Sequence, residues 1–524
     1  MSKENTSELL QILLKEKPRT HSKLNKIKRK FARDNKISKL ITNAELLNLY
    51  QELIATDDIK ANPVLRSLLK KRAIRTLSGV APIAVLTKPH PCPGNCAFCP
   101  TEFEMPKSYL SNEPAVMRAI MTQFDPYKQV TVRIKALTRN GHPTDKIELI
   151  VMGGTWSYFP DKYQNWYIKR CFDACNEKTS KTLAQAQKLN EAAKHRIVGL
   201  TLETRPDYIN ENEIIKFRKL GCTRVEIGVQ TTDDKILKKN KRGHGQKEII
   251  KATKLLKDAG FKVAYHMMPN LAGSTPKKDL QIFKDLFSKQ EYQPDMLKIY
   301  PCTVVKGSEL FNWWKKGKYK PYSQKQLVDL LLKIKLSIPE YVRIIRLIRD
   351  IPSVSIEAGN KITNLRQYLK EELKKQKKYC KCIRCREART NISAAKNAKL
   401  FTKKYQASQG TEYFLQFAST NKKTLFAFLR LRLAKQKKHF IPEISNAAII
   451  REIHTYGQMV PIEKKQAKAV QHLGFGKKLM KQAEIIAKNN GYDKMVVISG
   501  IGVRGYYRKL GYQLQGTYMV KKLT

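Results

Sequence analysis

The sequence predicts an α/β protein: a full or partial (β/α) barrel, preceded by a basic helical region and followed by a smaller α/β domain. From about residue 76, short runs of β-branched residues alternate with long amphipathic stretches, and a second group of such runs begins at about residue 410. Strands that alternate with helices form parallel sheets, because each helix returns the chain to the start of the next strand. The expected parts are 1–75 (basic helices), 76–358 (barrel), 359–400 (cysteine-containing linker) and 401–524 (smaller domain).

The barrel is expected to rest on seven runs of β-branched and apolar residues. In such barrels the chemistry lies at the carboxyl ends of the strands. The expected barrel strands are 80–88, 146–154, 196–204, 223–230, 262–269, 296–301 and 342–348. The smaller domain is expected to have strands at 428–434, 447–457 and 494–502, with a helix from residue 476.

The charge balance favours a polyanionic partner. The chain carries 101 Lys and Arg against 45 Asp and Glu, a formal net charge of +56. Such an excess attracts nucleic acid and gives affinity through the phosphates; a general lysine bias with solvated faces is the alternative. The expected RNA contacts are Lys26, Lys28, Arg29 and Lys30 in the N-terminal region.

The lengths of the apolar runs, the amino-terminal sequence and the cysteine clusters all favour an intracellular protein. No apolar run approaches the roughly 18 residues that a membrane helix needs, and the amino terminus lacks a charged stretch followed by an apolar core. We expect a cytoplasmic protein without membrane attachment. The ten cysteines are clustered, which in this compartment favours metal ligands over disulfides.

Cys92, Cys96 and Cys99 follow directly on the first expected barrel strand. Three thiolates without a nearby fourth suit a [4Fe–4S] cluster with one open iron, whereas structural zinc is normally closed by four ligands. The C-x3-C-x2-C spacing resembles the signature of radical-SAM enzymes, which implies that the open iron binds S-adenosylmethionine. Further cofactor contacts are expected at the strand ends, although each residue alone could be a satisfied core group: Gly153, Gly154, Thr155, Glu203, Glu226, Gln230 and His266.

A second site is expected in the smaller domain, where Gln471, Gly474 and Gly476 precede a helix. Glycines at a helix N-terminus let backbone N–H groups face a pyrophosphate. With the flanking strands, this pattern resembles the Gcn5-related N-acetyltransferase fold, which implies an acetyl-CoA site. Tyr506 and Tyr507 stand where that fold places a tyrosine near the thioester, Tyr507 being favoured; simple core packing of both is the alternative.

Cys380, Cys382 and Cys385 form a third group, in the linker. We expect them to hold zinc, with Cys302 as a candidate fourth ligand. A second iron–sulfur cluster and three free thiols are the alternatives.

From about residue 76 to 524 the chain resembles the catalytic subunit of Elongator, a tRNA uridine carboxymethyltransferase, in its stand-alone archaeal or bacterial form. Stretches that carry the resemblance include TKPHPCPGNCAFCP, GHPTDKIELIVMGGT, LTLETRPDY, GCTRVEIGVQ, REIHTYG, QHLGFG and GVRGYY. It implies catalytic roles for Lys146, Tyr506 and Tyr507. It does not say whether accessory subunits take part. The implied acetyl-CoA contacts are Lys146, Glu452, Ile453, His454, Thr455, Phe475, Gly476, Lys477 and Tyr507.

The resemblance also implies a reaction. A 5′-deoxyadenosyl radical would take hydrogen from the acetyl methyl group, and the carbon radical would add to C5 of uridine 34 in a tRNA anticodon. Thioester hydrolysis would leave a carboxymethyl group. The alternatives are a protein lysine acetyltransferase, another radical-SAM enzyme that modifies RNA, and a non-catalytic RNA-binding scaffold.

Overall fold

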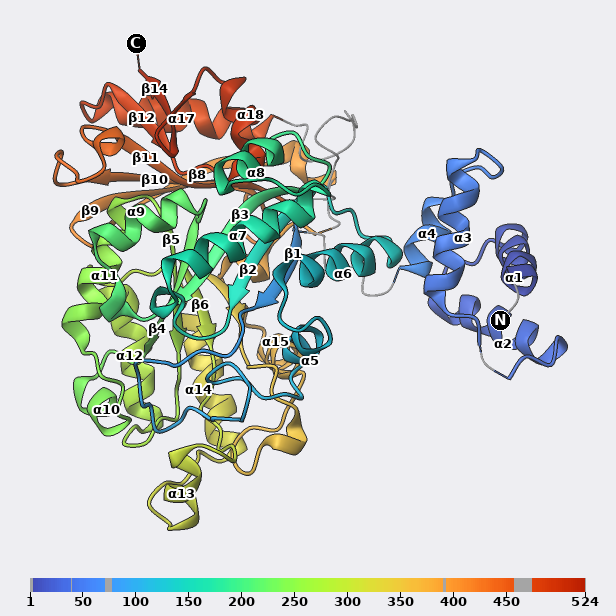
Figure 1. The fold of residues 1–524 in the computed structure, drawn as a ribbon, viewed down its shortest axis with the longest axis horizontal. Coiled ribbons are helices and arrows are strands. Elements are labelled where there is room, and N and C mark those ends of the chain that lie inside the picture. Colours follow the sequence, from blue (N-terminus) through green and yellow to red (C-terminus); the bar gives the residue numbers. More distant parts are fainter. Residues whose placement is uncertain (1–2, 39, 71–77, 390–392, 457–473, 524) are drawn as a thin grey trace.

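The computed structural model describes residues 3–38, 40–70, 78–389, 393–456 and 474–523. Figure 1 shows the N-terminal helices set apart from a larger body, in which a second sheet packs on one end of a parallel sheet. Among the described residues, no helix combines the length and apolar character needed to cross a membrane.

The N-terminal helices enclose a small core of their own. Thr20 and Thr42 cap the second and third helices through their side chains, and Tyr50 and several leucines are buried between the helices. The helices are α1 (Lys3–Glu16), α2 (His21–Asp34), α3 (Asn43–Ala55) and α4 (Pro63–Leu69).

One of the expected RNA contacts lies inside this core. Lys26, Arg29 and Lys30 are exposed on α2, but Lys28 is buried, and its Nζ donates a hydrogen bond to Asn43 Oδ1 at 2.7 Å. Burial also lowers the pKa of Lys28. The expectation that Lys28 contacts RNA is therefore wrong, because its position on α2 faces the neighbouring helix.

All seven expected barrel strands are present. They lie in sequence order in one sheet, and each neighbouring pair is parallel. Within the described residues β7 does not pair with β1, so the barrel is partial. The strands are β1 (Ala81–Leu86), β2 (Lys146–Met152), β3 (Arg196–Thr204), β4 (Arg224–Gln230), β5 (Lys262–Met267), β6 (Met296–Ile299) and β7 (Arg343–Arg346).

Helices cover the outer face of this sheet (Figure 1). They present apolar side chains such as Phe172, Phe217 and Leu256 to the core that the strands share. The helices are α5 (Pro114–Met121), α6 (Pro126–Arg139), α7 (Asp161–Asn176), α8 (Leu183–Asn190), α9 (Glu211–Lys219), α10 (Asp234–Lys239), α11 (Gln246–Asp258), α12 (Pro276–Ser288), α13 (Glu309–Lys315) and α14 (Gln324–Ser337).

The segment expected as a linker is partly built into the barrel. Leu365, Leu369 and Leu373 recur every four residues on α15 (Leu365–Lys375), and all three are buried in the barrel core. The short α16 (Ile383–Arg386) follows and carries Cys385.

The smaller domain is a mixed sheet with the order β13-β14-β12-β11-β10-β9-β8. β11 and β12 are parallel, and the other neighbours are antiparallel. Its elements are β8 (Lys399–Ala407), β9 (Gly410–Ala418), β10 (Leu425–Ala434), β11 (Ala448–Thr455), α17 (Phe475–Asn489), β12 (Lys494–Val497), α18 (Arg504–Arg508), β13 (Gln513–Gln515) and β14 (Tyr518–Lys522).

Both faces of β10, near the middle of this second sheet, are covered. Leu429, Leu431 and Leu433 of β10 point to the side of α17. The alternate residues Arg430 and Arg432 point to the barrel and are fully buried, because successive side chains of a strand face opposite sides.

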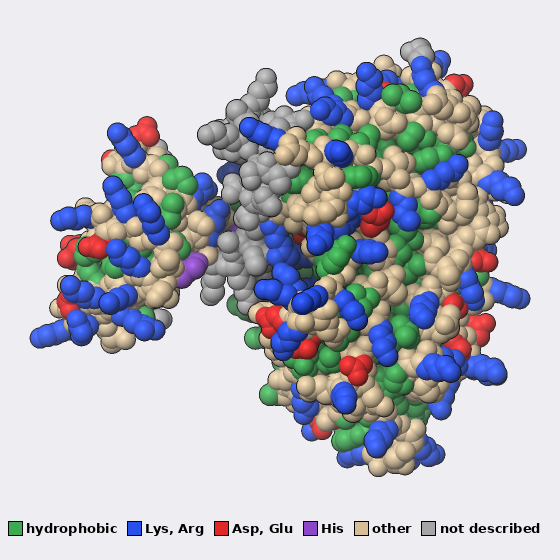
Figure 2. Space-filling model, turned by 180° about the vertical axis from the view of Figure 1, so that it is seen from behind, with side chains coloured by type: hydrophobic (Ala, Val, Ile, Leu, Met, Phe, Trp, Pro, Cys, Tyr) green, Lys and Arg blue, Asp and Glu red, His purple; other side chains and the backbone are tan. Residues whose placement is uncertain are grey.

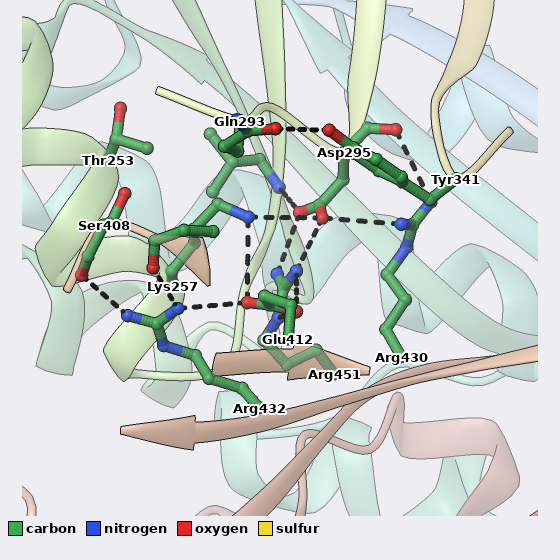
Figure 3. Close-up of polar contacts among 12 residues, drawn as sticks. Thr253, Lys257, Gln293, Asp295, Tyr341, Ser408, Glu412, Arg430, Arg432 and Arg451 are labelled. Atoms are coloured by element: carbon green, nitrogen blue, oxygen red, sulfur yellow. Dashed lines mark hydrogen bonds and ion pairs between the residues drawn. The ribbon is translucent and has the colours of Figure 1, made fainter. Parts of the chain in front are cut away.

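Figure 3 shows the ion network that pairs these arginines across the domain boundary. Arg432 donates to Asp258 Oδ1, at the end of α11, from Nε at 2.8 Å and Nη2 at 2.5 Å. Arg451 of β11 donates to both oxygens of Asp295, next to β6, and to Glu412 of β9. Buried charges that lack partners are costly, so this network fixes the second sheet on the barrel.

Candidate active site

The three signature cysteines lie on the loop that follows β1, at the carboxyl end of the barrel strands. The Cys99 N–H donates to the Cys96 carbonyl at 3.0 Å, which turns the loop back on itself. The Cys92 sulfur lies 3.7 Å from Thr155 Oγ1, on the loop after β2. Burial raises the pKa of the Cys99 thiol to about 11.

Two guanidinium groups face this loop. Arg242 donates from Nε and Nη2 to the Gly228 carbonyl and from Nη1 to the Cys96 sulfur at 3.3 Å. Arg205 is held by Asp207, and its buried Nη1 has no partner among the described atoms. A side chain at Gly94 would come within 2.1 Å of that nitrogen. The cationic surroundings and the three thiols fit an anionic iron–sulfur cluster, whose properties depend on charge and on hydrogen bonds to sulfur.

The glycine pair after β2 is required by the backbone. Gly153 has φ 137° and Gly154 has φ 98°, a region that side chains disfavour. A Cβ at Gly153 would also lie 1.8 Å from Thr87 Oγ1. Gln230, at the end of β4, is likewise in the left-handed region with φ 68°. The glycine turn therefore lets the chain after β2 pass close to Thr87, the residue that follows β1.

Glu203, Glu226 and His266 lie inside the barrel and are close enough together to bind a metal ion. Instead, Lys298 of β6 occupies the space between the carboxylates: its Nζ lies 3.0 Å from Glu203 and contacts Glu226 directly. His266 Nε2 lies 3.0 Å from Glu226. Burial alone would raise the pKa of Glu226, but Lys298 and His266 hold it well below its usual value.

This polar group continues in both directions along the barrel. Toward the cysteine loop, the Tyr109 hydroxyl donates to Glu203 at 3.1 Å. Toward the opposite end, Arg224 contacts both Glu226 and Glu148. Sequence reasoning missed Tyr109, Lys298 and Arg242; for Lys298 the signal was a charged residue within an otherwise apolar strand.

A cavity of about 1180 Å³ lies at the amino ends of the strands, between the barrel and the second sheet. At about 3.3 Å per residue, the seven residues of β2 separate the two ends of the barrel by about 20 Å. The barrel lines the cavity with the first residue of each strand from β2 to β7: Lys146, Arg196, Arg224, Lys262, Met296 and Arg343.

The second sheet opens at this cavity because its strands diverge. β11 pairs with β12 only over Ala448–Ile450, and a bulge interrupts its pairing with β10. The remainder of β11 therefore faces the cavity, as bulges next to sites commonly do. Glu452, Ile453, His454 and Thr455, all expected acetyl-CoA contacts, line it.

Helix α17 begins at the cavity wall. Gly474 caps it in the left-handed region with φ 71°, and Gly474, Gly476 and Lys477 line the cavity. Phe475 differs from the expectation: its ring stacks on Phe417 in the core, with centroids 4.5 Å apart. Gln471 lies outside the described residues.

The three expected catalytic residues, Lys146, Tyr506 and Tyr507, all line the cavity but differ in exposure. Tyr507 is buried, and Tyr506 is partly exposed with its hydroxyl close to Gly476. Burial raises the pKa of Tyr506 to about 12 and lowers the pKa of Lys146. His454 Nε2 lies 2.7 Å from the Ser78 carbonyl, and burial lowers the pKa of that imidazole.

Cys380, Cys382 and Cys385 place their sulfur atoms within 4.8 Å of one another. Cys302 is outside this group and is buried in the barrel core, where it contacts Tyr319. The expectation that Cys302 supplies a fourth ligand is therefore wrong, because its strand end faces the barrel interior.

The fold and the cysteine loop define a radical-SAM enzyme. The family model of the Radical SAM superfamily matches residues 90–286, and that of its C-terminal domain matches residues 294–375. This domain implies a [4Fe–4S] cluster and S-adenosylmethionine.

Full-length relatives narrow the class. The chain is 46% identical over 498 residues to the tRNA uridine(34) acetyltransferase of Methanocaldococcus infernus, covering 92% of this chain and 91% of that protein. It is 38% identical over 488 residues to Elongator complex protein 3 of Homo sapiens, covering 90% and 89%. A solved structure of archaeal M. infernus Elp3 with an N-terminal deletion matches with TM-score 0.75 and 44% identity, covering 85% of this chain and 100% of that one. The chain belongs to the Elongator complex protein 3 family.

Proposed function

We propose that this protein modifies uridine 34 of tRNA, attaching a carboxymethyl group at C5 with a two-carbon unit from acetyl-CoA. The names of its relatives support a tRNA uridine(34) substrate. The observation that carries the proposal is that one chain combines a cysteine loop suited to a radical source with a cavity suited to acetyl-CoA. Acetyl-CoA is the ligand that the second site fits best.

The cavity wall supplies groups that suit a nucleotide thioester. The N-terminus of α17 at Gly474 and Gly476 presents backbone N–H groups and the positive end of the helix dipole, which favours a pyrophosphate. Lys477 adds a cation on the same turn. Five of the six first strand residues in the lining are also basic. Arg224, Lys262 and Arg343 are paired with carboxylates, however, so the end of α17 carries the argument for phosphate.

At the carboxyl end, Cys92, Cys96 and Cys99 would hold the cluster. When bound, the cluster and S-adenosylmethionine supply the radical that removes hydrogen from the acetyl methyl group. The chain's own residues would orient the reacting groups and shield them from water. Glu226, His266 and Lys298 form a buried polar lining, and Tyr109 closes the lining beneath the cysteine loop.

The tRNA would bind through distributed positive charge. Figure 2 shows lysine and arginine side chains over both the N-terminal helices and the larger body. Lys26, Arg29 and Lys30 are exposed on α2 and suit phosphate contacts, which provide affinity and orientation without sequence information.

The test is an anaerobic reaction of the reconstituted protein with dithionite, S-adenosylmethionine, acetyl-CoA and tRNA with an unmodified uridine 34. Mass spectrometry of the nucleosides should detect 5-carboxymethyluridine. Cys96→Ala should abolish the product, and Tyr507→Phe should reduce it. Cys175→Ala, which removes a buried thiol from α7, is the matched control and should retain it.

If the protein were instead a lysine acetyltransferase, Cys96→Ala would have no effect. The wild type and Cys96→Ala would then acetylate protein lysines equally. The cavity disfavours that activity, because the starts of the barrel strands occupy one wall.

We also propose that Cys380, Cys382 and Cys385 bind zinc. Three soft sulfur ligands within 4.8 Å suit this ion. Elemental analysis of Cys382→Ser should show zinc lost relative to the wild type, with the Cys175→Ala protein retaining it.

A further inference from the structure

A row of aromatic rings lies beside the signature cysteines, on the loops that follow β1, β2 and β3 and on α7. Successive ring centroids along the row are 6.2, 5.7, 4.4, 4.8 and 5.6 Å apart. Rings at these separations contact one another and form an unbroken row. In order, the members of this rim row are Tyr208, Tyr158, His90, Phe159, Tyr163 and Trp166.

The rim row is fixed to the cysteine loop. His90 stands two residues before Cys92, and its Nε2 lies 3.2 Å from the Tyr158 carbonyl. The Lys88 backbone N–H donates to the Tyr163 hydroxyl at 3.2 Å. The row therefore has a set position relative to the site where radical chemistry is proposed.

Toward both ends the row reaches solvent. Tyr158 is 42% exposed and Trp166 is 44% exposed, whereas Phe159 in the middle is buried. The buried ring anchors the row, and Tyr158 and Trp166 remain partly accessible to solvent.

One exposed lysine lies against the row, and two nearby carboxylates are paired with cations. Asp161 is paired with Lys216 at 2.9 Å, and Asp207 with Arg205 at 2.9 Å. Lys88 is exposed, with Nζ 5.1 Å from the centre of the Tyr163 ring. Flat aromatic faces beside a lysine suit single-stranded nucleic acid, whose bases stack and whose phosphates pair with cations.

We propose that the rim row is a stacking platform for unpaired bases of an RNA loop, namely the bases next to the one that reacts. This inference rests on the proposed function and adds the contact surface for its substrate. An enzyme that acts on a base must take that base out of its stack. The neighbouring bases then lose a stacking partner, and protein aromatic rings commonly replace it.

The experiment uses the full-length reconstituted protein and an anticodon stem-loop with 2-aminopurine next to uridine 34. Binding to the wild type should quench the fluorescence as the probe stacks. Tyr158→Ala and Trp166→Ala should each weaken binding about tenfold and reduce the quenching. Tyr158→Phe keeps the ring and should behave as the wild type, and a fully paired duplex of the same length should bind all variants equally.

Wild-type affinity and quenching in both alanine variants would overturn the inference. If Tyr158→Ala does not fold, as judged by its circular dichroism melt, Trp166→Ala decides, because that side chain lies on an exposed helix face. Failure of the proposed function can be distinguished from failure of this inference. In that case the wild type binds and quenches but forms no 5-carboxymethyluridine.

Discussion

Arg451 of β11 holds Asp295, the residue before β6, through two hydrogen bonds of 2.8 and 2.5 Å across the domain boundary. Both side chains are fully buried. Lys257 and Glu412 extend the contact at 3.5 and 2.9 Å. The barrel and the second sheet thus share an ionic core, which fixes the two walls of the cavity relative to each other.

Removal of one partner from this network should be strongly destabilising. Asp295→Asn removes the carboxylate that Arg451, Lys257 and Arg430 share and leaves these buried cations with too few anions. We expect the free energy of unfolding to fall by about 3–5 kcal/mol. Urea denaturation followed by circular dichroism measures this. Asp161→Asn, which breaks an exposed pair with Lys216, is the control and should cost at most about 1 kcal/mol. Equal losses in the two variants would contradict the ionic-core interpretation.

The same network should make the protein sensitive to acid. Arg451 and Lys257 hold the pKa of Asp295 below its ordinary value, and that of Glu412 is also lowered. A carboxyl whose pKa is lowered by folding stabilises the fold above its unfolded pKa and loses that contribution as pH falls. Urea midpoints should therefore decline from about pH 5 downward, and the decline should be shallower in Asp295→Asn.

Sequence patterns predicted the barrel strands well, but they gave no indication that the arginines of the second sheet are buried. Alternating leucine and arginine on β10 is typical of a strand with one solvent face. Arg430 and Arg432 are nevertheless buried, because the barrel covers that face. A periodicity states which residues share a face, but only tertiary packing decides what covers it. Lys28 differs from the prediction for the same reason.

Lys298 should act as the structural cation of the barrel interior. Its loss in Lys298→Met leaves Glu203 and Glu226 buried without their shared partner, at an expected cost of about 3–5 kcal/mol. The double variant Lys298→Met/Glu226→Gln should recover part of this loss. Lys241→Met, which breaks an exposed pair with Glu309, is the control for denaturation experiments. A double variant less stable than Lys298→Met would contradict this role.

The sequence could define the local motifs of the two sites, but not the residues that depend on partners elsewhere in the chain. The cysteine loop and the glycine turn of α17 are each short segments of sequence, so their spacing alone was enough to predict them as sites. Cys302 and Lys298 could not be assigned in this way, because each acts with residues far away along the chain. Their partners, Tyr319 for Cys302 and Glu226 for Lys298, are set by the barrel geometry.

Two neighbouring lysines on α17 should differ in their effect on acetyl-CoA binding. Both lysines are exposed, but Lys477 lines the cavity and Lys478 is absent from the described lining. Lys477→Ala should raise the dissociation constant several-fold by calorimetry, and Lys478→Ala should leave it unchanged. Gly476→Ala should raise it about tenfold, equivalent to about 1.4 kcal/mol, because the added Cβ would lie 2.9 Å from the Tyr506 hydroxyl. Equal effects of the two lysine variants would argue against the cavity as the acetyl-CoA site.

The exposed basic residues of α2 should contribute to tRNA affinity through phosphates. Replacing Lys26, Arg29 and Lys30 with glutamine should weaken binding and flatten its salt dependence, because each phosphate contact contributes about 0.7–0.9 to the slope of log K against log salt. Lys28→Met is the matched control: Lys28 is buried against Asn43, so its loss should change the melting temperature more than the affinity. Filter binding across a salt series measures both effects. A triple variant with the wild-type slope would show that α2 does not contact the RNA backbone, and would place the phosphate contacts on the larger body.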